Sequence, residues 1–244
     1  MKFGLFSDVH ANWEAFSAVI EEFNKERVDQ YVFLGDIVGY GADPVRCVRE
    51  LKELIKRYDC QCLAGNHDHA ACGLTDTALF NAHAKASIEW TKRQLEKEDF
   101  DFLAGMKMVF ENKYFLAVHA NPVAPKEWGY ISDIDDAHVN FKCFQQQLCF
   151  IGHSHRPIIF TQFDTVDAII EPEVKLKKKG KYIINIGSVG QPRDGNPAAC
   201  CAIYDTDKSL VEIRRVRYDI TTAQEKIYQA NLPKILAERL SLGK

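Results

Sequence analysis

Five short polar motifs, each directly after an apolar run typical of a buried strand, constrain the fold of this chain more than any other feature. In α/β sheets, polar groups that follow the carboxyl ends of strands meet at one edge of the sheet. We therefore expect the motifs to converge on one site. In chain order they are Asp8-Val9-His10, Gly35-Asp36, Gly65-Asn66-His67-Asp68, His119 and Gly152-His153-Ser154-His155.

The first third of the chain alternates apolar runs with amphipathic segments. Residues 11–27 carry apolar side chains at helical spacing, which predicts a helix. Asp43 and Pro44 are typical of the N-cap and first turn of a second helix, which runs to about residue 58. The apolar runs predict strands at 2–7, 31–34 and 60–64. This βαβαβ order predicts a parallel sheet.

The remainder of the chain changes character near residue 148. Before that point, the pattern predicts a helix at 75–97 that includes Leu79, a strand at 114–118, and helices at 100–103 and 133–147. After it, short apolar runs separated by turns predict strands at 149–152, 157–163, 182–186, 198–204 and 210–217. Two sheets with helices outside them fit this order best.

Neither an internal repeat nor a linker composition interrupts the 244 residues. We therefore predict a single domain over 1–244. Its C-terminal segment, 221–244, has a helical pattern that Pro233 interrupts. This segment is expected to pack on a sheet or on a second subunit, and a homodimer stays open at this stage.

Charge and composition argue against several functional classes. The net charge of -3 is not that of a general nucleic-acid binder. Apolar runs are too short for a membrane span or a signal-peptide core, so a cytoplasmic protein without a membrane partner is expected. The eight cysteines lack the two-residue spacer of zinc or redox pairs, which favours buried thiols in a reducing compartment.

The polar motifs together supply two aspartates, one asparagine and five histidines. Imidazole and carboxylate together suit manganese, iron, zinc or nickel, whereas calcium prefers oxygen ligands only. Eight groups are too many for one catalytic ion, but they suffice for two ions that share a carboxylate, with His67 left over. Any one motif alone is more often structural, but five together at strand ends indicate a metal site.

The ordered set of motifs resembles the calcineurin-like metallophosphoesterase superfamily, over residues 2–204. Residues 36–41 (Asp-Ile-Val-Gly-Tyr-Gly) and 185–193 (Asn-Ile-Gly-Ser-Val-Gly-Gln-Pro-Arg) are similar to its compact prokaryotic metallophosphatase and phosphodiesterase subgroup. The resemblance implies an α/β fold, namely a four-layer α/β/β/α sandwich of two mixed sheets flanked by helices. The chain is longer than minimal members, and the extra length predicts helical rim segments near 75–101 and 121–147.

The resemblance also implies residue roles around two divalent transition-metal ions. His67 would be catalytic by stabilising the transition state or protonating the leaving oxygen. Asp36 would bridge the ions together with a water or hydroxide, which attacks the phosphorus. The remaining metal ligands would be Asp8, His10 and His155 for one ion, and Asn66, His119 and His153 for the other.

Departures from the superfamily pattern bear on the substrate. Gly39 and Tyr40 stand where the protein-phosphatase and dinucleoside-tetraphosphatase branches carry a polar residue and an arginine. This lowers the prospect of either activity. Arg193 is a candidate for gripping a phosphate oxygen, and Tyr40 and Trp128 are candidates for stacking on a base or aryl group. The other histidines, His69, His83 and His138, are not expected to bind metal.

Three functions remain open from the sequence. The preferred one is hydrolysis of a small-molecule phosphodiester or phosphomonoester by a metal-dependent enzyme. A non-catalytic scaffold on the same fold is an alternative, although scaffold relatives lose ligands that this chain retains. A nuclease is the third, and the acidic charge balance gives it little support.

Overall fold

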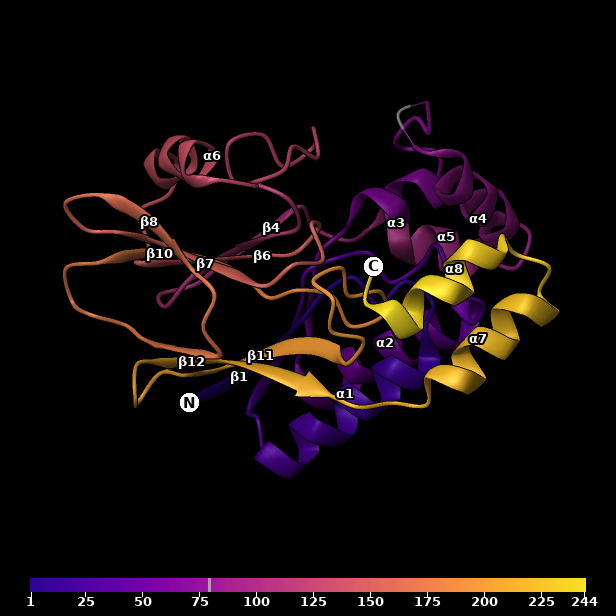
Figure 1. Cartoon of the computed structure of the whole chain (residues 1–244), viewed down its shortest axis with the longest axis horizontal. Helices are drawn as coiled ribbons and strands as arrows, with labels where there is room; N and C mark the ends of the chain where they lie inside the picture. Colours follow the sequence, from indigo (N-terminus) through magenta and orange to yellow (C-terminus); the bar gives the residue numbers. More distant parts are fainter. Residues whose placement is uncertain (79) are drawn as a thin grey trace.

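Two mixed β-sheets form the centre of the computed structural model, which describes residues 1–78 and 80–244 (Figure 1). In the first sheet, β1, β2 and β3 run parallel and β11 joins β1 in the antiparallel sense. The predicted parallel βαβαβ unit is therefore confirmed. The strand order is β3 (Gln61–Cys62), β2 (Gln30–Phe33), β1 (Lys2–Phe6), β11 (Ala199–Asp205), β12 (Leu210–Val216) and β9 (Glu173–Lys175).

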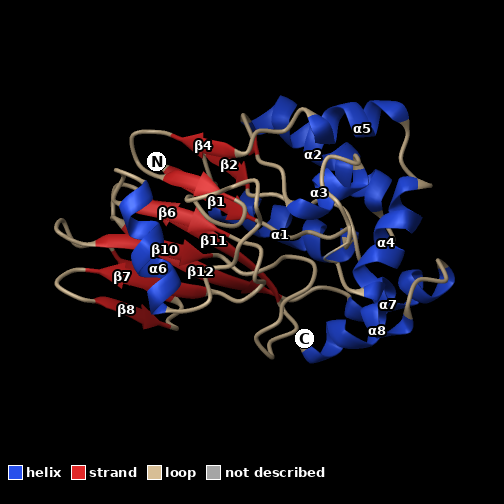
Figure 2. Ribbon diagram, turned by 90° about the horizontal axis from the view of Figure 1, so that it is seen from above, coloured by secondary structure: helices blue, strands red, loops and turns tan. Residues whose placement is uncertain are grey.

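The second sheet lies against the first (Figure 2). Its central strands β5, β6 and β10 run parallel, and β4, β7 and β8 extend it in the antiparallel sense. The order is β4 (Val109–Glu111), β5 (Leu116–Val118), β6 (Leu148–Ile151), β10 (Lys181–Asn185), β7 (Ile158–Gln162) and β8 (Val166–Ile169).

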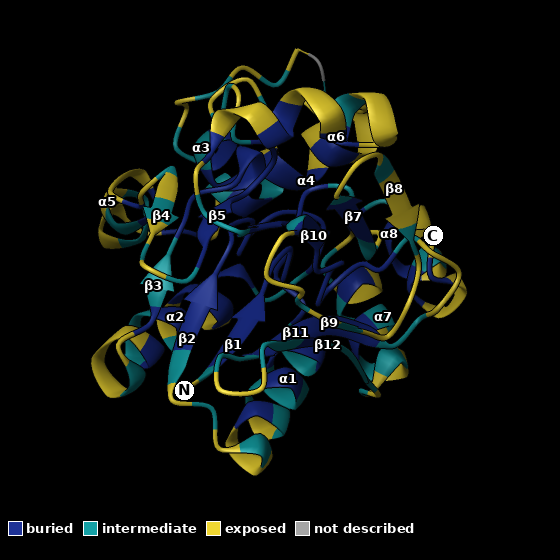
Figure 3. Cartoon of the chain, turned by 90° about the vertical axis from the view of Figure 1, so that its left-hand side faces the viewer, coloured by how far each residue is buried: buried dark blue, intermediate teal, exposed yellow. Residues whose placement is uncertain are grey.

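Helices cover the outer face of each sheet, and three apolar layers separate the elements. Between the sheets, Phe3 and Leu5 pack with Phe115 and Phe150. A second core joins the first sheet to α1 (Trp13–Glu26), α2 (Pro44–Tyr58) and α5 (Lys97–Ala104). A third joins the other sheet to α6 (Ile134–Asn140) and the short η1 (Phe141–Cys143). Buried residues fill these layers and exposed ones lie outside (Figure 3). The predicted α/β/β/α sandwich is confirmed.

The two helices of the N-terminal unit begin near their predicted residues. Asn12 caps α1 by accepting a hydrogen bond from the Ala15 N–H at 3.1 Å. Asp43 occupies the N-cap position of α2, but its carboxylate makes no capping hydrogen bond. Instead, the carboxylate accepts a hydrogen bond from Lys226 Nζ at 2.6 Å. It therefore pairs with the C-terminal segment and does not cap the helix.

The predicted helix at 75–97 is shorter than its apolar pattern indicated. After α3 (Asn66–Ala71), residues 72–78 form turns and bends, and α4 spans only Ala82–Lys92. Asn81 starts α4 by accepting from the N–H groups of His83 and Ala84, both at 3.0 Å. Leu79, which was part of the predicted helix, lies outside the described residues. Likewise, the predicted helix at 133–147 ends with η1 at Cys143.

Three edge or near-edge strands were not predicted from the sequence. β4, β8 and β9 are three or four residues long and lack buried side chains. Because they are largely exposed, they carry no apolar run that would distinguish them from loops. Basic side chains follow at 175–181, where the chain turns from β9 into β10.

The C-terminal segment forms α7 (Ile220–Gln229), α8 (Lys234–Glu238) and the 3₁₀ turn η2 (Arg239–Leu242). Pro233 precedes α8 as its N-cap residue and interrupts the helical run as expected. These elements bury Ile227 and Leu236 in a fourth core that also contains Tyr40 and Ala84. The segment therefore packs beside the loop after β2, away from the sheet faces.

Most of the cysteines are buried. All eight cysteines are free thiols, and the Sγ atoms of Cys60 and Cys62 are 3.7 Å apart. Cys143 is exposed, so the expectation of buried thiols is wrong at that position. Within the described part of the chain, none of the helices has the length and apolar character needed to span a membrane.

Candidate metal centre

The five motifs meet at the carboxyl ends of five strands. β1, β2 and β3 carry three of them and β5 and β6 the other two, so both sheets contribute. The predicted convergence is confirmed. All eight side chains are buried, at most 8% exposed: Asp8, His10, Asp36, Asn66, His67, His119, His153 and His155.

The backbone at this site is held in an unusual conformation. A left-handed conformation costs an ordinary residue roughly 1–2 kcal/mol, and such residues cluster at functional sites. Here φ lies between +50° and +66° at Asp8, His10, Asp36, His153 and His155. The surrounding structure therefore holds these side chains in position at a cost in local stability.

The first cluster consists of Asp8, His10 and His155, whose ligand-type atoms all lie within 4.8 Å of one another. The Nε2 atoms of His10 and His155 are 3.0 Å apart. Asp8 Oδ1 lies 3.2 Å from His155 Nε2 and 3.7 Å from His10 Nε2. One carboxylate and two imidazoles at these distances suit a divalent transition metal.

The second cluster consists of Asp36, His119 and His153. His119 Nε2 lies 3.2 Å from His153 Nδ1 and 3.4 Å from Asp36 Oδ2. The same Asp36 oxygen lies 3.7 Å from His10 Nε2 in the first cluster. Asp36 therefore stands between the two clusters, and one of its oxygens faces both.

A backbone carbonyl orients each of the four imidazoles in these clusters. Because a carbonyl only accepts, the ring nitrogen beside it carries a proton, and the other nitrogen faces the cluster. The contacts are His10 Nδ1 to Val38 O at 3.0 Å, His119 Nδ1 to Leu34 O at 2.8 Å, His153 Nε2 to Trp128 O at 2.9 Å and His155 Nδ1 to Gln191 O at 2.6 Å.

Two buried oxygens in the site lack a hydrogen-bond partner among the described residues. They are Asp8 Oδ1 and Asn66 Oδ1. A buried polar atom without a partner costs about 1–3 kcal/mol, and more when it is charged. A bound cation would satisfy both oxygens, so the donor set and its unpaired atoms fit a metal centre.

Asp68, the last residue of the third motif, organises the loop after β2. Its carboxylate accepts from the backbone N–H groups of Gly65 at 3.0 Å, Asp36 at 2.7 Å, Ile37 at 2.9 Å and Val38 at 3.3 Å. The two carboxylates therefore have different tasks. Asp36 faces the clusters, whereas Asp68 fixes the backbone that presents it. The sequence analysis assigned Asp68 no role of its own.

The segment after β10 ties the two sheets' ligand loops together. The Asn185 amide donates to Gly152 O at 2.6 Å and to Ser154 Oγ at 2.9 Å, beneath the His153 loop. The Ser188 hydroxyl donates to the carbonyl of Asp8 at 2.9 Å. These contacts of Asn185 and Ser188 were not predicted from the sequence.

Neighbouring histidines keep both carboxylates ionised. Burial raises the pKa of Asp8, but His155 and His10 outweigh it and hold that pKa well below its usual value. Burial also opposes ionisation of Asp36, and His119 in particular holds its pKa well below the usual range. The centre therefore presents two negative charges at neutral pH.

The imidazoles differ in charge because their surroundings differ. Burial lowers the pKa of His119, but Asp36 outweighs it and raises the pKa to about 9. Burial lowers the pKa of His153 to about 4, with His119 adding to the effect. Burial and then Arg193 lower the pKa of His155 to about 3. His153 and His155 are therefore neutral at physiological pH, the form that binds a cation.

His67 lines the pocket and forms a third potential metal-binding group with His10 and Asp36. Its ring centroid is 4.5 Å from that of Tyr40 and 4.9 Å from that of Phe80. Its buried Nδ1 atom has no hydrogen-bond partner among the described residues. Burial lowers the pKa of His67 well below its usual value, so the imidazole is neutral at neutral pH.

A pocket of about 240 Å³ opens above Asp36, Asn66 and His67. The three residues predicted to contact substrate, Arg193, Tyr40 and Trp128, all line it. Its rim combines residues 75–76 and 80–84 with residues 127–130, and Trp128 Nε1 joins the two by donating to Thr75 Oγ1 at 3.2 Å. Phe80 and Tyr130 also line the pocket, and the sequence analysis missed both.

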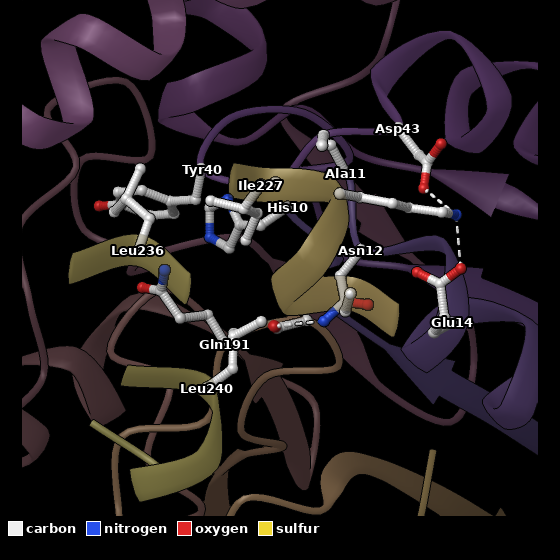
Figure 4. Close-up of a pocket in the computed structure, with 15 residues that line it drawn as sticks. His10, Ala11, Asn12, Glu14, Tyr40, Asp43, Gln191, Ile227, Leu236 and Leu240 are labelled. Carbon is white, nitrogen blue, oxygen red and sulfur yellow. Dashed lines mark hydrogen bonds and ion pairs between the residues drawn. The ribbon is translucent and has the colours of Figure 1, made fainter. Parts of the chain in front are cut away.

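The opposite side of His10 is closed by the C-terminal helices. Figure 4 shows His10 and Tyr40 beside Ile227, Leu236 and Leu240. The space between them is about 10 Å³, the size that holds a single water molecule. Among the described residues, the larger pocket is therefore the side from which a substrate can reach the centre.

The remaining histidines lie outside the two clusters. His83 and His138 are exposed on α4 and α6. The ring of His69 meets that of Trp128 edge-on, with centroids 5.3 Å apart. None of the three belongs to a potential metal-binding group among the described residues.

Two solved structures are similar to this chain over its whole length. A metallophosphoesterase from Sphaerobacter thermophilus is similar in structure, with a TM-score of 0.86, 36% identity and complete coverage of both chains. A hypothetical protein from Pyrococcus horikoshii has the same fold, with a TM-score of 0.82 and 18% identity over 100% of this chain and 98% of that one.

Sequence comparison gives the same family. An uncharacterised protein from Methanocaldococcus jannaschii is 38% identical over 245 residues, which cover 98% of this chain and 97% of the relative. The family model of the calcineurin-like phosphoesterase superfamily domain matches residues 1–209. With two adjoining His/Asp clusters at the predicted strand ends, the chain belongs to the calcineurin-like phosphoesterase superfamily.

Proposed function

We propose that this protein is a dinuclear metal-dependent phosphoesterase that hydrolyses a small-molecule phosphodiester or phosphomonoester. The observation that carries the proposal is the position of Asp36, one oxygen of which lies 3.4 Å from His119 Nε2 and 3.7 Å from His10 Nε2. A carboxylate shared in this way is what a pair of neighbouring cations requires. Membership of the superfamily supports hydrolysis of a phosphoester.

The ligand assignment follows the two clusters. His10, His155 and Asp8 would hold one ion, and His119, His153 and Asn66 the other, with Asp36 bridging. Manganese, iron, zinc or nickel suit this mixture of imidazole and oxygen ligands. When bound, the ions supply Lewis-acid stabilisation and a water that ionises readily.

The chain's own residues supply position and charge around the reacting phosphate. In hydrolysis, the oxygen of water forms a new bond to phosphorus, the ester P–O bond breaks, and the departing oxygen takes a proton. His67 lines the pocket, and burial lowers its pKa, so a ring N–H of the neutral imidazole would donate a hydrogen bond to that oxygen. Arg193 would grip a non-bridging phosphate oxygen.

The shape of the pocket favours a small substrate. It encloses about 240 Å³ between Tyr40, Phe80 and Trp128, whose rings could stack on a base or aryl group. A scaffold role is disfavoured because every candidate ligand is present and the carboxylates are held ionised. A nuclease is disfavoured by the net charge of -3.

The test uses metal-stripped protein reloaded singly with manganese, nickel, iron, zinc or magnesium. Hydrolysis of bis-(p-nitrophenyl) phosphate and of p-nitrophenyl phosphate would be followed by absorbance. We expect metal-dependent turnover, with a ratio between the two substrates that distinguishes a diesterase from a monoesterase. Metal content would be measured on the same samples.

The variants separate the centre from the rest of the fold. Asp36→Asn should lose both metal and turnover, whereas His67→Ala should retain metal and lose about 10²–10⁴-fold in kcat. His138→Ala, at an exposed histidine on α6, is the matched control and should behave as wild type. Two ions bound per chain without turnover of any ester would favour a scaffold, and full activity of His67→Ala would remove that residue from the mechanism.

A further inference from the structure

A second groove borders the pocket over the candidate metal centre. It encloses about 550 Å³ between the segment around Tyr130 and the loops that follow β6 and β10. Tyr130 and Arg193 line both the groove and the pocket. The two spaces therefore adjoin across one shared wall, and a ligand seated over the centre can extend into the groove.

The groove carries a positive charge that nothing nearby neutralises. Arg156 and Arg193 line it, and neither forms an ion pair with any residue that the structure describes. Asp194 is the carboxylate in its lining, and it is already paired with Arg215. Two arginines without a counter-charge in a concave space are typical of a site for an anion.

Hydrogen bonds fix the two arginines relative to the candidate metal ligands. The Arg193 N–H donates to the carbonyl of His155 at 3.1 Å, and Arg156 Nε donates to the carbonyl of Arg193 at 2.9 Å. The Arg193 guanidinium is steadied by Gln191 Oε1, at 2.7 and 3.2 Å. The arginines are thus built into the same two loops that hold the His155 ring.

The other wall of the groove is apolar. Pro157 and Ile158 follow Arg156 in the chain, and Ile170 lines the groove with 81% of its surface exposed. An isoleucine this exposed next to an unpaired arginine favours a ligand with both an apolar part and an anionic group. Ser132 adds a hydroxyl donor at the same groove.

From these observations we infer that the groove is a second substrate subsite that binds an additional phosphate group. The inference rests on the proposed function and specifies its substrate class: a phosphoester that carries a second phosphate on the part of the molecule beyond Arg193. The scissile group would lie over Asp36. Arg193, which lines both spaces, would donate to an oxygen of each phosphate, whereas Arg156 would donate to the second phosphate alone. Phosphate suits this site because its several oxygens can accept from both guanidinium groups.

The test compares two substrates that differ only in the second phosphate. They are thymidine 5′-(p-nitrophenyl phosphate) and the same compound with a 3′-phosphate, and both release p-nitrophenol. With wild-type, metal-loaded protein, we expect kcat/KM to be about 10- to 100-fold higher for the 3′-phosphorylated compound, the range of one or two charge-assisted hydrogen bonds.

Arg156→Gln should reduce that preference to less than about threefold, because the donor to the second phosphate loses its charge. Arg49→Gln, which removes the same charge from an exposed position on α2, should leave the preference at the wild-type value. Preference retained in full by Arg156→Gln, or absent from wild type, would overturn the inference. Thermal melting of each variant checks that the fold is intact.

A binding measurement separates failure of the subsite from failure of the enzyme. Isothermal titration would compare adenosine 3′,5′-bisphosphate with adenosine 5′-monophosphate on wild-type and Arg156→Gln protein. We expect tighter binding of the bisphosphate by wild type only. If bis-(p-nitrophenyl) phosphate is hydrolysed but a second phosphate improves neither kcat/KM nor binding, the subsite is wrong and the proposed function stands. A binding advantage without hydrolysis of any ester would support the subsite and contradict the enzyme.

Discussion

The carboxylate of Asp68 accepts a hydrogen bond from the backbone N–H of Asp36 at 2.7 Å. One aspartate thus holds the main chain from which the other projects between the two histidine clusters. Asp68 lies on α3 and Asp36 follows β2, so the contact joins the second and third motifs of the chain. The geometry of the candidate centre therefore depends on a residue that is itself outside both clusters.

Asp68→Asn tests this dependence. The asparagine amide keeps one acceptor oxygen, but an NH₂ group replaces the other. This NH₂ group cannot accept from the backbone N–H groups that the second carboxylate oxygen now satisfies. We expect a loss of about 2–3 kcal/mol in the free energy of unfolding, measured by chemical denaturation. Asp101→Asn, on the exposed face of α5, is the matched control and should change stability by less than about 0.5 kcal/mol. Equal stability of the two variants would contradict the role of Asp68.

Gly39→Ala tests the packing around His67. At Gly39, φ is +89°, and an added Cβ would lie 2.3 Å from His67 Nδ1. We expect the ring to be displaced and kcat to fall at least about tenfold. Gly73→Ala is a matched control, since φ there is +73° but nothing lies within 4 Å of the added Cβ. It should cost only about 1–2 kcal/mol of stability, with turnover unchanged. Equal turnover by both variants would show that contact with Gly39 does not position His67.

Lys226→Met tests the link between α7 and the N-terminal unit. Lys226 Nζ lies 2.5 Å from Glu14 Oε1 and 2.6 Å from Asp43 Oδ2, so its removal leaves two part-buried carboxylates unpaired. We expect the free energy of unfolding to fall by about 1–2 kcal/mol. Lys85→Met, on an exposed position of α4, is the control.

The same contact predicts how stability depends on pH. Burial lowers the pKa of Lys226, but the hydrogen bonds to Asp43 and Glu14 outweigh it and raise that pKa. A group whose pKa is raised by folding stabilises the protein fully below its ordinary value, and this contribution is lost as pH rises through the folded value. The difference between wild type and Lys226→Met should therefore be constant at neutral pH and shrink at strongly alkaline pH. A difference that grows above pH 10 would contradict it.

Metal removal should lower thermal stability. A ligand that binds only the folded state adds about 4 kcal/mol at a thousandfold excess over its Kd. Calorimetry of reloaded and chelator-treated protein should therefore show a clear fall in Tm on stripping. Asp36→Asn, which lacks the shared carboxylate, should show a smaller difference between the two states. An unchanged Tm in wild type would argue against metal bound by these residues.

The position of the centre was predictable because each of its parts depends on local sequence. An apolar run marks a strand, and the polar residue that follows it lies at the strand's carboxyl end, as at Asp8 and His119. Parallel pairing then brings the ends of neighbouring strands together. Arg193, Tyr40 and Trp128, which the sequence suggested as substrate contacts, line the pocket.

What the sequence did not indicate depends on contacts between distant segments. Trp128 was noted for its ring, but its carbonyl is what orients the imidazole of His153. Such a contact cannot be predicted from the residue type, because every residue has a backbone carbonyl. Similarly, the N-cap position of Asp43 was correct, but its carboxylate pairs with Lys226, which lies 183 residues away. The strands β4 and β8 were not predicted because an exposed edge strand buries no side chains and so needs no apolar run.

The division of the centre between two sheets has a consequence for the order of events during synthesis. Asp8, His10, Asp36 and Asn66 are made early, on the strands of the first sheet, whereas His119, His153 and His155 follow on the second. One candidate ion site is incomplete until His153 has emerged and the other until His155 has emerged, and both require the two sheets to dock. We therefore expect metal to bind after the two sheets have docked. A chain that is still being synthesised would lack a full set of ligands and would bind metal ions weakly.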